Sequence, residues 1–400
     1  MTLHILSLAT LFPDASRPNF GIFVEKSLNA LARQPDVALT IVAPIGLPPW
    51  PLSLHPRYAA LRALPLREQW RGLTLERPRF TLIPRFSARF NAMMIARAVW
   101  PIAQRMRTEQ RLDVVDAQFF HPDGPAAAHI AARLGLPFSI KARGSDISFW
   151  ANRADTGGAI RRAAQSAAGL LAVSVSLKAD MVALGMPEDR IHIHYTGLDA
   201  EQFHPVDSGA ARARWGQPLD APVLLTVGAL THRKGQHIVL QAMARLPADT
   251  HYVLAGGGEE AGRLAKLAEV LGLAGRVHLL GAVAHDSLAS LYSAADVMVL
   301  PSASEGLANA WVEALACGTP LVLSDIPPAH EMIDAADAGR IAAATPQGIA
   351  DAVRAVLRQR TDREALAART KARFDWQRNG AELAEHLRGL AMVSAANEQA

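Results

Sequence analysis

The chain alternates short hydrophobic runs with longer amphipathic stretches. In the first half the short runs are HILSLAT, ALTIVAP, DVVDAQF, PFSIKAR and GLLAVSV. The second half repeats the pattern with PVLLTVG, HYVLAGG, RVHLLG, DVMVLPS and TPLVLSD. Between these runs, stretches such as GIFVEKSLNALARQ and GQHIVLQAMARL space their apolar residues as a helix does. Strands that alternate with helices predict parallel sheets covered by helices, an α/β fold.

One segment without sustained periodicity divides the chain. Residues 198–222 are rich in turn-forming residues, and we expect a linker over about 205–220. The length of 400 residues is more than a single hydrophobic core usually serves. We therefore expect two doubly wound domains, residues 1–204 and 205–375, facing each other across a cleft. Doubly wound sheets bind ligands outside the carboxyl ends of their strands, so the cleft is the expected site.

Composition and charge narrow the class of protein. Half of the residues are hydrophobic, one fifth are charged and the net charge is +4, which fits a globular protein and does not indicate a nucleic-acid partner. The single cysteine, Cys317, allows no internal disulfide and fits a reducing compartment. The apolar start MTLHILSLATLF lacks the basic segment and cleavage site of a signal peptide, and the sequence contains no run long enough to span a membrane. These features predict a cytoplasmic protein.

The most informative stretch is PSASEGLANAWVEALACGTPLVLSD, residues 301–325. Glu305 lies in the turn after a predicted strand, and Glu313 lies about two turns inside the following helix. Eight helical residues rise ~12 Å. That separation is unsuited to chelating one metal ion and suits the two ends of an extended ligand, with a helix N-terminus available to an anion between them. A nucleotide sugar is such a ligand. The alternative is two carboxylates that face solvent.

This stretch and several others resemble a known family. PSASEGLANAWVEALACGTPLVLSDIPPAHEMI is similar to the donor-site signature of the retaining GT-B glycosyltransferases of family 4, the group 1 glycosyltransferases. Further segments match that family in the same order, namely TGLDAEQFHP, VGALTHRKG, AGGGEE, RVHLLGAV, DAGRIAAATPQGIADAV and FDWQRNG. The resemblance implies the GT-B fold with two Rossmann-like domains. It also implies a C-terminal helix, residues 376–400, that packs back towards the N-terminal domain.

The resemblance implies roles for residues of the second domain. Glu305 would bind the hydroxyls of the transferred sugar, Glu313 would bind the ribose hydroxyls, and Lys234 would neutralise the diphosphate leaving group. Backbone N–H groups would assist Glu305, and the residues that carry them are Gly306, Leu307, Ala308 and Asn309. Positioned cations and amides of this kind act where charge develops in the transition state.

One position of the phosphate-binding loop departs from the family pattern. The family commonly has an arginine where this chain has Ala229. Either Arg233 supplies the missing charge, or Lys234 and the backbone hold the phosphate alone. A solvated pair of surface cations is the alternative, and the position of R-K-G between a strand and a helix argues against it.

The first domain carries Gly21 as a candidate contact to the donor and other candidate contacts to the acceptor. Gly21 stands near a helix start, where a missing side chain would let a phosphate approach the backbone, although many loop glycines serve only the turn. In DAQFFHPDGPAAA, the family tends to have a histidine where Gln118 stands and an aromatic residue where His121 stands. Either side chain could face the reacting sugar or the acceptor, unless the loop only caps the next helix. KARGSDI offers further acceptor or phosphate contacts, Arg143, Ser145 and Asp146, with an exposed ion pair in a strand-end turn as the alternative.

Arginines are concentrated between Arg57 and Arg111, where acidic residues are few and aromatic residues are interleaved. A predicted helix in this stretch has one apolar face with arginines beside it, formed by Phe90, Met94, Ala98 and Pro101. Such a face can lie on an anionic membrane surface. The alternative is a helix whose apolar side packs on the first sheet and whose arginines are solvated.

The resemblance implies a retaining hexosyltransferase that uses a UDP- or GDP-sugar. The acceptor would be a saccharide or a lipid-linked saccharide in polysaccharide or glycan biosynthesis, at the inner face of the cell membrane or in the cytoplasm. Front-face substitution, in which the leaving phosphate helps to deprotonate the acceptor, would require no enzymic nucleophile, no obligatory metal and no other cofactor. His192 and His194 alternate on a strand without a third ligand nearby, which argues against a metal site.

Two other classes of protein remain open. Ala229 and Gln118 allow a catalytically silent nucleotide-sugar binding protein. A nicotinamide-dependent oxidoreductase is disfavoured, because AGGGEE lacks G-x-G-x-x-G spacing. The sequence specifies neither the sugar, the base, the acceptor nor the oligomeric state.

Overall fold

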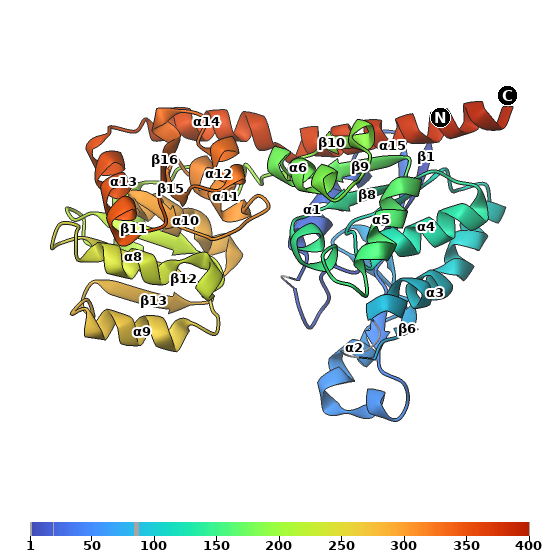
Figure 1. Cartoon of the computed structure of the whole chain (residues 1–400), viewed down its shortest axis with the longest axis horizontal. Helices are drawn as coiled ribbons and strands as arrows, with labels where there is room; N and C mark the ends of the chain where they lie inside the picture. The colour runs from blue at the N-terminus through green and yellow to red at the C-terminus, as the bar shows by residue number, and fades with distance from the viewer. Residues whose placement is uncertain (1, 19, 84–87, 400) are drawn as a thin grey trace. The chain divides into compact units, whose positions relative to one another are not determined.

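The computed structural model describes residues 2–18, 20–83 and 88–399, and the chain forms two compact units (Figure 1). The N-terminal unit comprises Met1–Gly197 and Trp376–Ala400, and the C-terminal unit comprises Leu198–Asp375. The expected boundary lay at residues 204 and 205, whereas the units meet at Gly197 and Leu198. The turn-rich segment that follows Leu198 therefore belongs to the C-terminal unit.

The N-terminal unit is built on an eight-stranded sheet with the order β10-β9-β8-β7-β1-β2-β5-β4. Only β4 (Arg67–Trp70) is antiparallel, and it pairs with β5 (Leu73–Glu76) at the edge. The parallel strands are β1 (Leu3–Leu8), β2 (Val37–Val42), β7 (Val114–Ala117), β8 (Phe138–Ala142), β9 (Gly169–Ala172) and β10 (Ile191–Ile193), together with β5. Because β2 lies on one side of β1 and β7 on the other, the strand order reverses between β1 and β7, where such sheets bind ligands.

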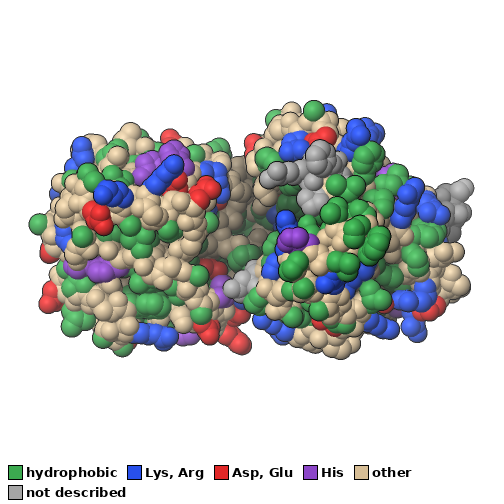
Figure 2. All heavy atoms as spheres, turned by 90° about the horizontal axis from the view of Figure 1, so that it is seen from below, with side chains coloured by type: hydrophobic (Ala, Val, Ile, Leu, Met, Phe, Trp, Pro, Cys, Tyr) green, Lys and Arg blue, Asp and Glu red, His purple; other side chains and the backbone are tan. Residues whose placement is uncertain are grey.

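Residues 45–81 form an insertion that also supplies β4 and β5 of the main sheet, where Leu73 and Leu75 are buried, while none of residues 50–63 is buried. It contains the two-stranded sheet of β3 (Ile45–Leu47) and β6 (Arg79–Thr81), two short 3₁₀ turns and α2 (Ala59–Ala63). Large apolar side chains are exposed here, among them Trp50, Leu52 and Leu54. The surface of the N-terminal unit mixes hydrophobic with Lys and Arg side chains when it is viewed from below (Figure 2, right).

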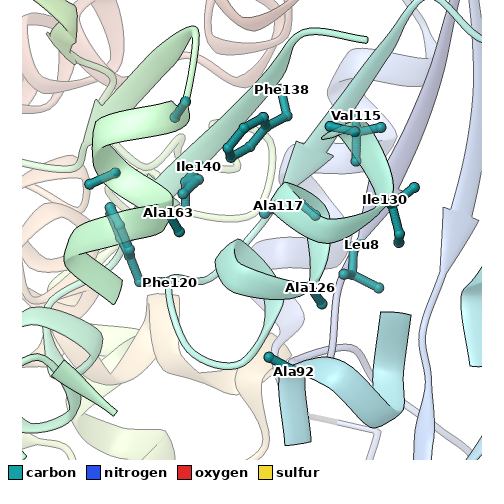
Figure 3. Close-up of a cluster of buried hydrophobic side chains, with 14 of the residues drawn as sticks. Leu8, Ala92, Val115, Ala117, Phe120, Ala126, Ile130, Phe138, Ile140 and Ala163 are labelled. Carbon is teal, nitrogen blue, oxygen red and sulfur yellow. The ribbon is translucent and has the colours of Figure 1, made fainter. Parts of the chain in front are cut away.

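The two faces of the N-terminal sheet carry different helices. On one face α3 (Ala88–Thr108), α4 (Asp123–Leu134) and α5 (Gly157–Ser166) cover a core that includes Phe120, Ile130, Phe138 and Ile140 (Figure 3). On the other face α1 (Ile22–Ala32) and α15 (Trp376–Gln399) pack on the remaining side chains of the sheet. The side chains of strand β1 contribute to both cores, because Leu6 and Leu8 lie in the core on the first face while Leu3 and Ile5 lie in the core on the second.

Helix α3 packs on the sheet with a face other than the expected one. Ala92, Ile95, Val99, Ile102 and Met106 are buried in the first core at helical spacing. The expected apolar face was wrong, because Phe90 and Pro101 are exposed and only Met94 and Ala98 pack partly against the core. None of the described helices is long and apolar enough to cross a membrane.

The C-terminal unit is a parallel sheet of six strands with the order β13-β12-β11-β14-β15-β16. The strands are β11 (Val223–Val227), β12 (His251–Ala255), β13 (Val277–Gly281), β14 (Val297–Leu300), β15 (Leu321–Ser324) and β16 (Gly339–Ala342). Its helices include α8 (Gln236–Met243), α9 (Ala261–Val270), α10 (Leu288–Ala294), α11 (Asn309–Ala316), α13 (Pro346–Arg358) and α14 (Arg363–Phe374). The order reverses between β11 and β14, so the loops after these two strands are neighbours.

The C-terminal helix α15 is part of the N-terminal unit. It packs along α1, and Leu383 and Leu387 join the second core. His386 lies against the sheet, with Nε2 2.9 Å from Ser139 Oγ. Burial lowers the pKa of His386 from its ordinary value of 6.5 to about 4, and nearby His192 and Lys141 act in the same direction.

We predict that His386→Gln makes the protein less sensitive to acid. A histidine whose pKa is depressed on folding contributes stability above its unfolded pKa that is lost as the pH falls from 6.5 towards 4. The loss amounts to about 3 kcal/mol at most for this group. Thermal unfolding of wild type and variant from pH 7 to pH 4 measures it, with exposed His129→Gln as the control. Parallel curves for wild type and His386→Gln would refute the assignment.

Candidate functional site

The loops after β11 and β14 are held together at the carboxyl edge of the C-terminal sheet. The loop after β11 turns through a 3₁₀ segment, His232–Lys234, into α8, and the loop after β14 leads into α11. Gly235 has a φ of 73°, and a side chain there would collide with the Pro301 carbonyl. Ala303 N–H donates to the Arg233 carbonyl at 2.8 Å. The two loops are therefore in direct contact and form one continuous surface.

An ion pair joins the tips of these loops. Lys234 Nζ lies 2.5 Å from Glu305 Oε1, and the side chains are only 13% and 9% exposed. Arg233 Nη1 lies 3.5 Å from the same carboxylate oxygen and also donates to the Ser304 carbonyl. The structure thus brings three of the predicted site residues together, with the charge of Glu305 balanced by cations of the neighbouring loop.

Unpaired backbone donors lie beside this ion pair. Among the described residues, no acceptor meets the N–H groups of Gly306, Leu307 or Ala308. Ala308 precedes α11 and gives it no side-chain cap. A helix N-terminus with free N–H groups favours an anion or a hydroxyl oxygen.

Glu313 lies four residues after Asn309, the first residue of α11, and so about one helical turn inside the helix rather than two. Its carboxylate is 8% exposed. Tyr292 Oη donates to Glu313 Oε2 at 2.9 Å, and His285 Nε2 lies 3.4 Å from Oε1. Burial and the Glu313 carboxylate raise the pKa of Tyr292 well above its ordinary value, so the phenol keeps its proton.

Gln202 fixes the tautomer of His285. Its amide Nε2 donates to the His285 carbonyl at 2.6 Å and lies 2.9 Å from His285 Nδ1. Because the amide is a donor, Nδ1 accepts and the ring proton sits on Nε2, facing Glu313. The carboxylate of Glu313 is thus oriented by two donors.

Sequence reasoning missed Gln202, His285 and Tyr292. The segment HDSLASLYSAA has the apolar spacing of a helix and contains no motif that marks a binding site. The signal was the spacing of seven residues between His285 and Tyr292, two helical turns, which places both side chains on one face.

In the N-terminal unit, most of the candidate acceptor contacts form a closed network. Gln118 is buried, and its Nε2 donates to Asp116 at 2.6 Å while its Oε1 accepts from Arg143 Nη2 at 2.5 Å. Asp146 is also buried and accepts the backbone N–H groups of Phe120, Arg143 and Gly144. The expected alternative of an exposed ion pair is therefore wrong. Burial raises the pKa of Asp146, against the effect of these hydrogen bonds.

Ser145 is exposed and makes no capping hydrogen bond to the turn that follows. Gly21 precedes α1 with a φ of 72°, and a side chain there would collide with the Leu11 carbonyl. This close approach accounts for the glycine without a ligand.

His121 differs from the other candidates of the N-terminal unit. It is 3% exposed, its ring lies 4.9 Å from that of Trp150, and neither ring nitrogen makes a hydrogen bond of normal geometry to a described residue. Burial lowers its pKa to about 4, so the ring is neutral at pH 7. It lines a cavity of about 460 Å³ in this unit. In the described part of the chain, no three His, Cys, Asp or Glu side chains are arranged to hold a metal ion.

Family models match both units. Residues 207–373 match the model described as glycosyl transferases group 1, and residues 58–202 match that of glycosyltransferase family 4. The D-inositol 3-phosphate glycosyltransferase of Mycobacterium tuberculosis is 40% identical over 147 residues. That match spans 36% of this chain and 30% of the length of the relative.

Solved structures match nearly the whole chain. Sucrose-phosphate synthase from Thermosynechococcus elongatus has a TM-score of 0.80 at 20% identity, covering 98% of this chain and 100% of the other. HepE of Anabaena in complex with UDP has a TM-score of 0.75 at 19% identity, with coverage of 98% and 100%. At these identities the likeness concerns the fold, which is the GT-B fold with two Rossmann-like domains. The chain belongs to the group 1 glycosyltransferases of the family 4 type.

We predict a strong energetic coupling between Lys234 and Glu305 in the ligand-free protein. Removing Glu305 leaves the mostly buried Lys234 ammonium uncompensated, and removing Lys234 leaves Glu305 only its longer contact with Arg233, whereas removing both leaves neither charge of the pair. A double-mutant cycle of Lys234→Met and Glu305→Gln should give a coupling free energy of about 1–3 kcal/mol in chemical unfolding. The exposed pair Lys266 and Glu269 provides the control cycle. Coupling no larger than that of the control would contradict the geometry.

Proposed function

We propose that the protein moves a hexose-type sugar from a UDP- or GDP-sugar to a saccharide or lipid-linked saccharide, with retention of configuration, in polysaccharide or glycan biosynthesis. The observation that carries this proposal is the Lys234–Glu305 ion pair beside the free N–H groups of Gly306–Ala308. HepE, which has been solved with UDP and with UDP-glucose, supports a nucleotide-sugar donor.

The ion pair provides a cation for the diphosphate. A diphosphate carries more charge than one carboxylate and would displace Glu305 from Lys234. Lys234 and the free N–H groups would then face the oxygen on which negative charge develops as the glycosidic bond breaks. In this proposal these groups, with Arg233 beside them, take the place of an obligatory metal ion.

The two glutamates would hold opposite ends of the donor. Released from Lys234, Glu305 would accept hydrogen bonds from hydroxyls of the transferred sugar. Glu313, oriented by Tyr292 and His285, would accept hydrogen bonds from the ribose hydroxyls. Because both carboxylates are mostly buried, their free lone pairs would strongly favour hydroxyl donors.

Retention would follow from front-face substitution. The bond between the anomeric carbon and the diphosphate oxygen breaks, and the acceptor oxygen bonds to the same face of that carbon. The proton of the acceptor hydroxyl passes to the leaving phosphate oxygen, so no enzymic nucleophile is consumed. In this proposal His121, neutral and without a hydrogen bond of normal geometry to a described residue, hydrogen-bonds a hydroxyl of the reacting sugar or the acceptor, and Gln118 positions the loop that carries it.

A peripheral contact with an anionic membrane is part of the proposal for a lipid-linked acceptor. The support is the exposed apolar side chains of the insertion, Trp50, Leu52 and Leu54, next to Arg57. Apolar groups beside arginines suit the interface of an anionic bilayer.

The second candidate is a nucleotide-sugar binding protein without catalysis. The engagement of Gln118 by Asp116 and Arg143 favours it, because that buried amide is held by two protein partners. The same experiment tests both candidates.

A panel of UDP-, GDP- and ADP-sugars, scored by thermal stabilisation and by slow hydrolysis, tests the donor class. We expect one donor to stabilise the protein and to be hydrolysed. Binding without hydrolysis, and without transfer to any saccharide tested, would favour the silent candidate. Absence of binding by every donor would refute both.

Two substitutions test whether Glu313 binds the ribose and Glu305 binds the transferred sugar. Glu313→Ala should weaken binding of the free nucleoside diphosphate by about 10–100-fold, since two hydrogen bonds to the ribose are lost. Glu305→Ala should leave that affinity unchanged or raise it, because the carboxylate that competes for Lys234 is gone, and it should lower kcat with the intact donor by about 100-fold. Exposed Glu364→Ala is the matched control. Equal losses of nucleotide affinity in both variants would overturn the assignment.

A further inference from the structure

The cavity that His121 lines lies at the strand-order reversal of the N-terminal sheet. It has a volume of about 460 Å³ and is bounded by the segments that follow β1, β2 and β7. Its walls are rich in aromatic rings, namely Phe12, Phe20, Tyr58, Phe80, Phe119 and Trp150. Aromatic faces pack well against sugar rings, polyol carbons and isoprenoid chains.

The charge that faces this cavity has one sign. Arg17, Arg57 and Arg77 line it, and no Asp or Glu is among its described lining residues. Two of the three guanidinium groups are neutralised outside the cavity. Arg17 pairs with Asp14 at 2.7 Å, and Arg77 pairs with Glu68 at 2.5 Å.

Arg57 is the exception. It is exposed and takes part in no ion pair with a described residue, and its guanidinium contacts the Tyr58 ring at 4.9 Å from the centroid. A guanidinium presents a planar fork of N–H donors that matches phosphate oxygens. One positive charge of the cavity therefore remains for a ligand.

His121 supplies the complementary polar group. Its ring is buried in the cavity wall, and neither nitrogen makes a hydrogen bond of normal geometry to a described residue, although the Ala88 backbone interacts with the ring. A buried polar group without a partner costs free energy that a ligand hydroxyl can recover. A neutral imidazole offers one donor, one acceptor and no charge, which suits a hydroxyl better than an anion, so the two polar ends of the cavity differ in what they bind best.

We propose that this cavity binds the acceptor through a phosphate group held by Arg57, with the aromatic walls against its carbon skeleton and His121 at a hydroxyl. This inference rests on the proposed function, for which it names the class of acceptor. The phosphate can belong to a soluble sugar phosphate or to a lipid phosphate. Trp50, Leu52 and Leu54 precede Arg57 and are 80%, 62% and 57% exposed, so an apolar chain attached to the phosphate would find a surface there.

Direct binding in the absence of any donor tests the proposal. The probes are two matched pairs, glucose 6-phosphate with glucose, and farnesyl phosphate with farnesol, titrated calorimetrically into the full chain. We expect at least one phosphorylated probe to bind at least tenfold more tightly than its phosphate-free partner. A preference within the sugar pair identifies a soluble acceptor, and a preference within the farnesyl pair identifies a lipid-linked one. Equal or absent binding within both pairs would overturn the proposal.

Variants of Arg57 show whether this residue binds the phosphate of the probe. Arg57→Ala should remove at least tenfold of the preference for the phosphorylated probe, and Arg57→Lys should retain part of it, because the charge remains while the planar fork of donors is lost. Arg97→Ala removes an exposed arginine outside the cavity and should leave the preference intact. Equal weakening of both members of a pair by Arg57→Ala would indicate a structural role and contradict the proposal.

Nucleoside diphosphate titrations of the same variants separate this inference from the proposed function. Unchanged nucleotide affinity in Arg57→Ala, with the phosphate preference lost, supports both. Nucleotide binding without any phosphate preference refutes only the inference, whereas phosphate preference without nucleotide binding refutes only the proposed donor chemistry.

Discussion

Parallel pairing of strands is the constraint on which both units depend. It brings the carboxyl ends of all the parallel strands to one edge, and it leaves a gap between connections where the strand order reverses. In the C-terminal unit this reversal lies between β11 and β14, so Lys234 and Glu305 meet although 71 residues separate them. In the N-terminal unit it lies between β1 and β7, where the aromatic cavity and His121 are found. The same geometry thus produces the Lys234–Glu305 ion pair in one unit and the aromatic cavity in the other.

The two sites differ in how their charge is compensated. At the C-terminal site Lys234 is paired with Glu305, so a diphosphate would have to exchange one anionic partner for another. In the ligand-free protein, Lys234 and Glu305 compensate each other, so neither charge is buried without a partner. At the N-terminal site Arg57 is exposed, and hydration stabilises its charge until a ligand arrives. Selectivity for a diphosphate in one place and a phosphate monoester in the other would follow from this difference.

The fold could be predicted because buried parallel strands are continuous apolar runs. Strands β8 and β14 are buried at every position and were clear in the sequence. The insertion was not predicted, since its strands are short and half exposed, as in Arg67–Trp70. At the site, the alternation of strand and helix placed Lys234 and Glu305 in loops and the family resemblance implied their roles, but their contact came only from the structure. The side chain of Gln118 is held by hydrogen bonds to Asp116 and Arg143, and the spacing of these residues in the sequence does not reveal those contacts. The buried face of α3 was predicted wrongly because its apolar residues lie on more than one side of the helix, so the sequence does not show which side faces the sheet.

In the proposed function, Lys234 exchanges Glu305 for the diphosphate of the donor. The most direct measurement is the affinity for nucleoside diphosphate and monophosphate in wild type, Lys234→Met and Glu305→Gln. The account predicts that Lys234→Met loses the preference for the diphosphate. It predicts that Glu305→Gln binds the diphosphate as tightly as wild type or more tightly, because the competing carboxylate is gone. Weaker diphosphate binding in Glu305→Gln, or an unchanged preference in Lys234→Met, would contradict it.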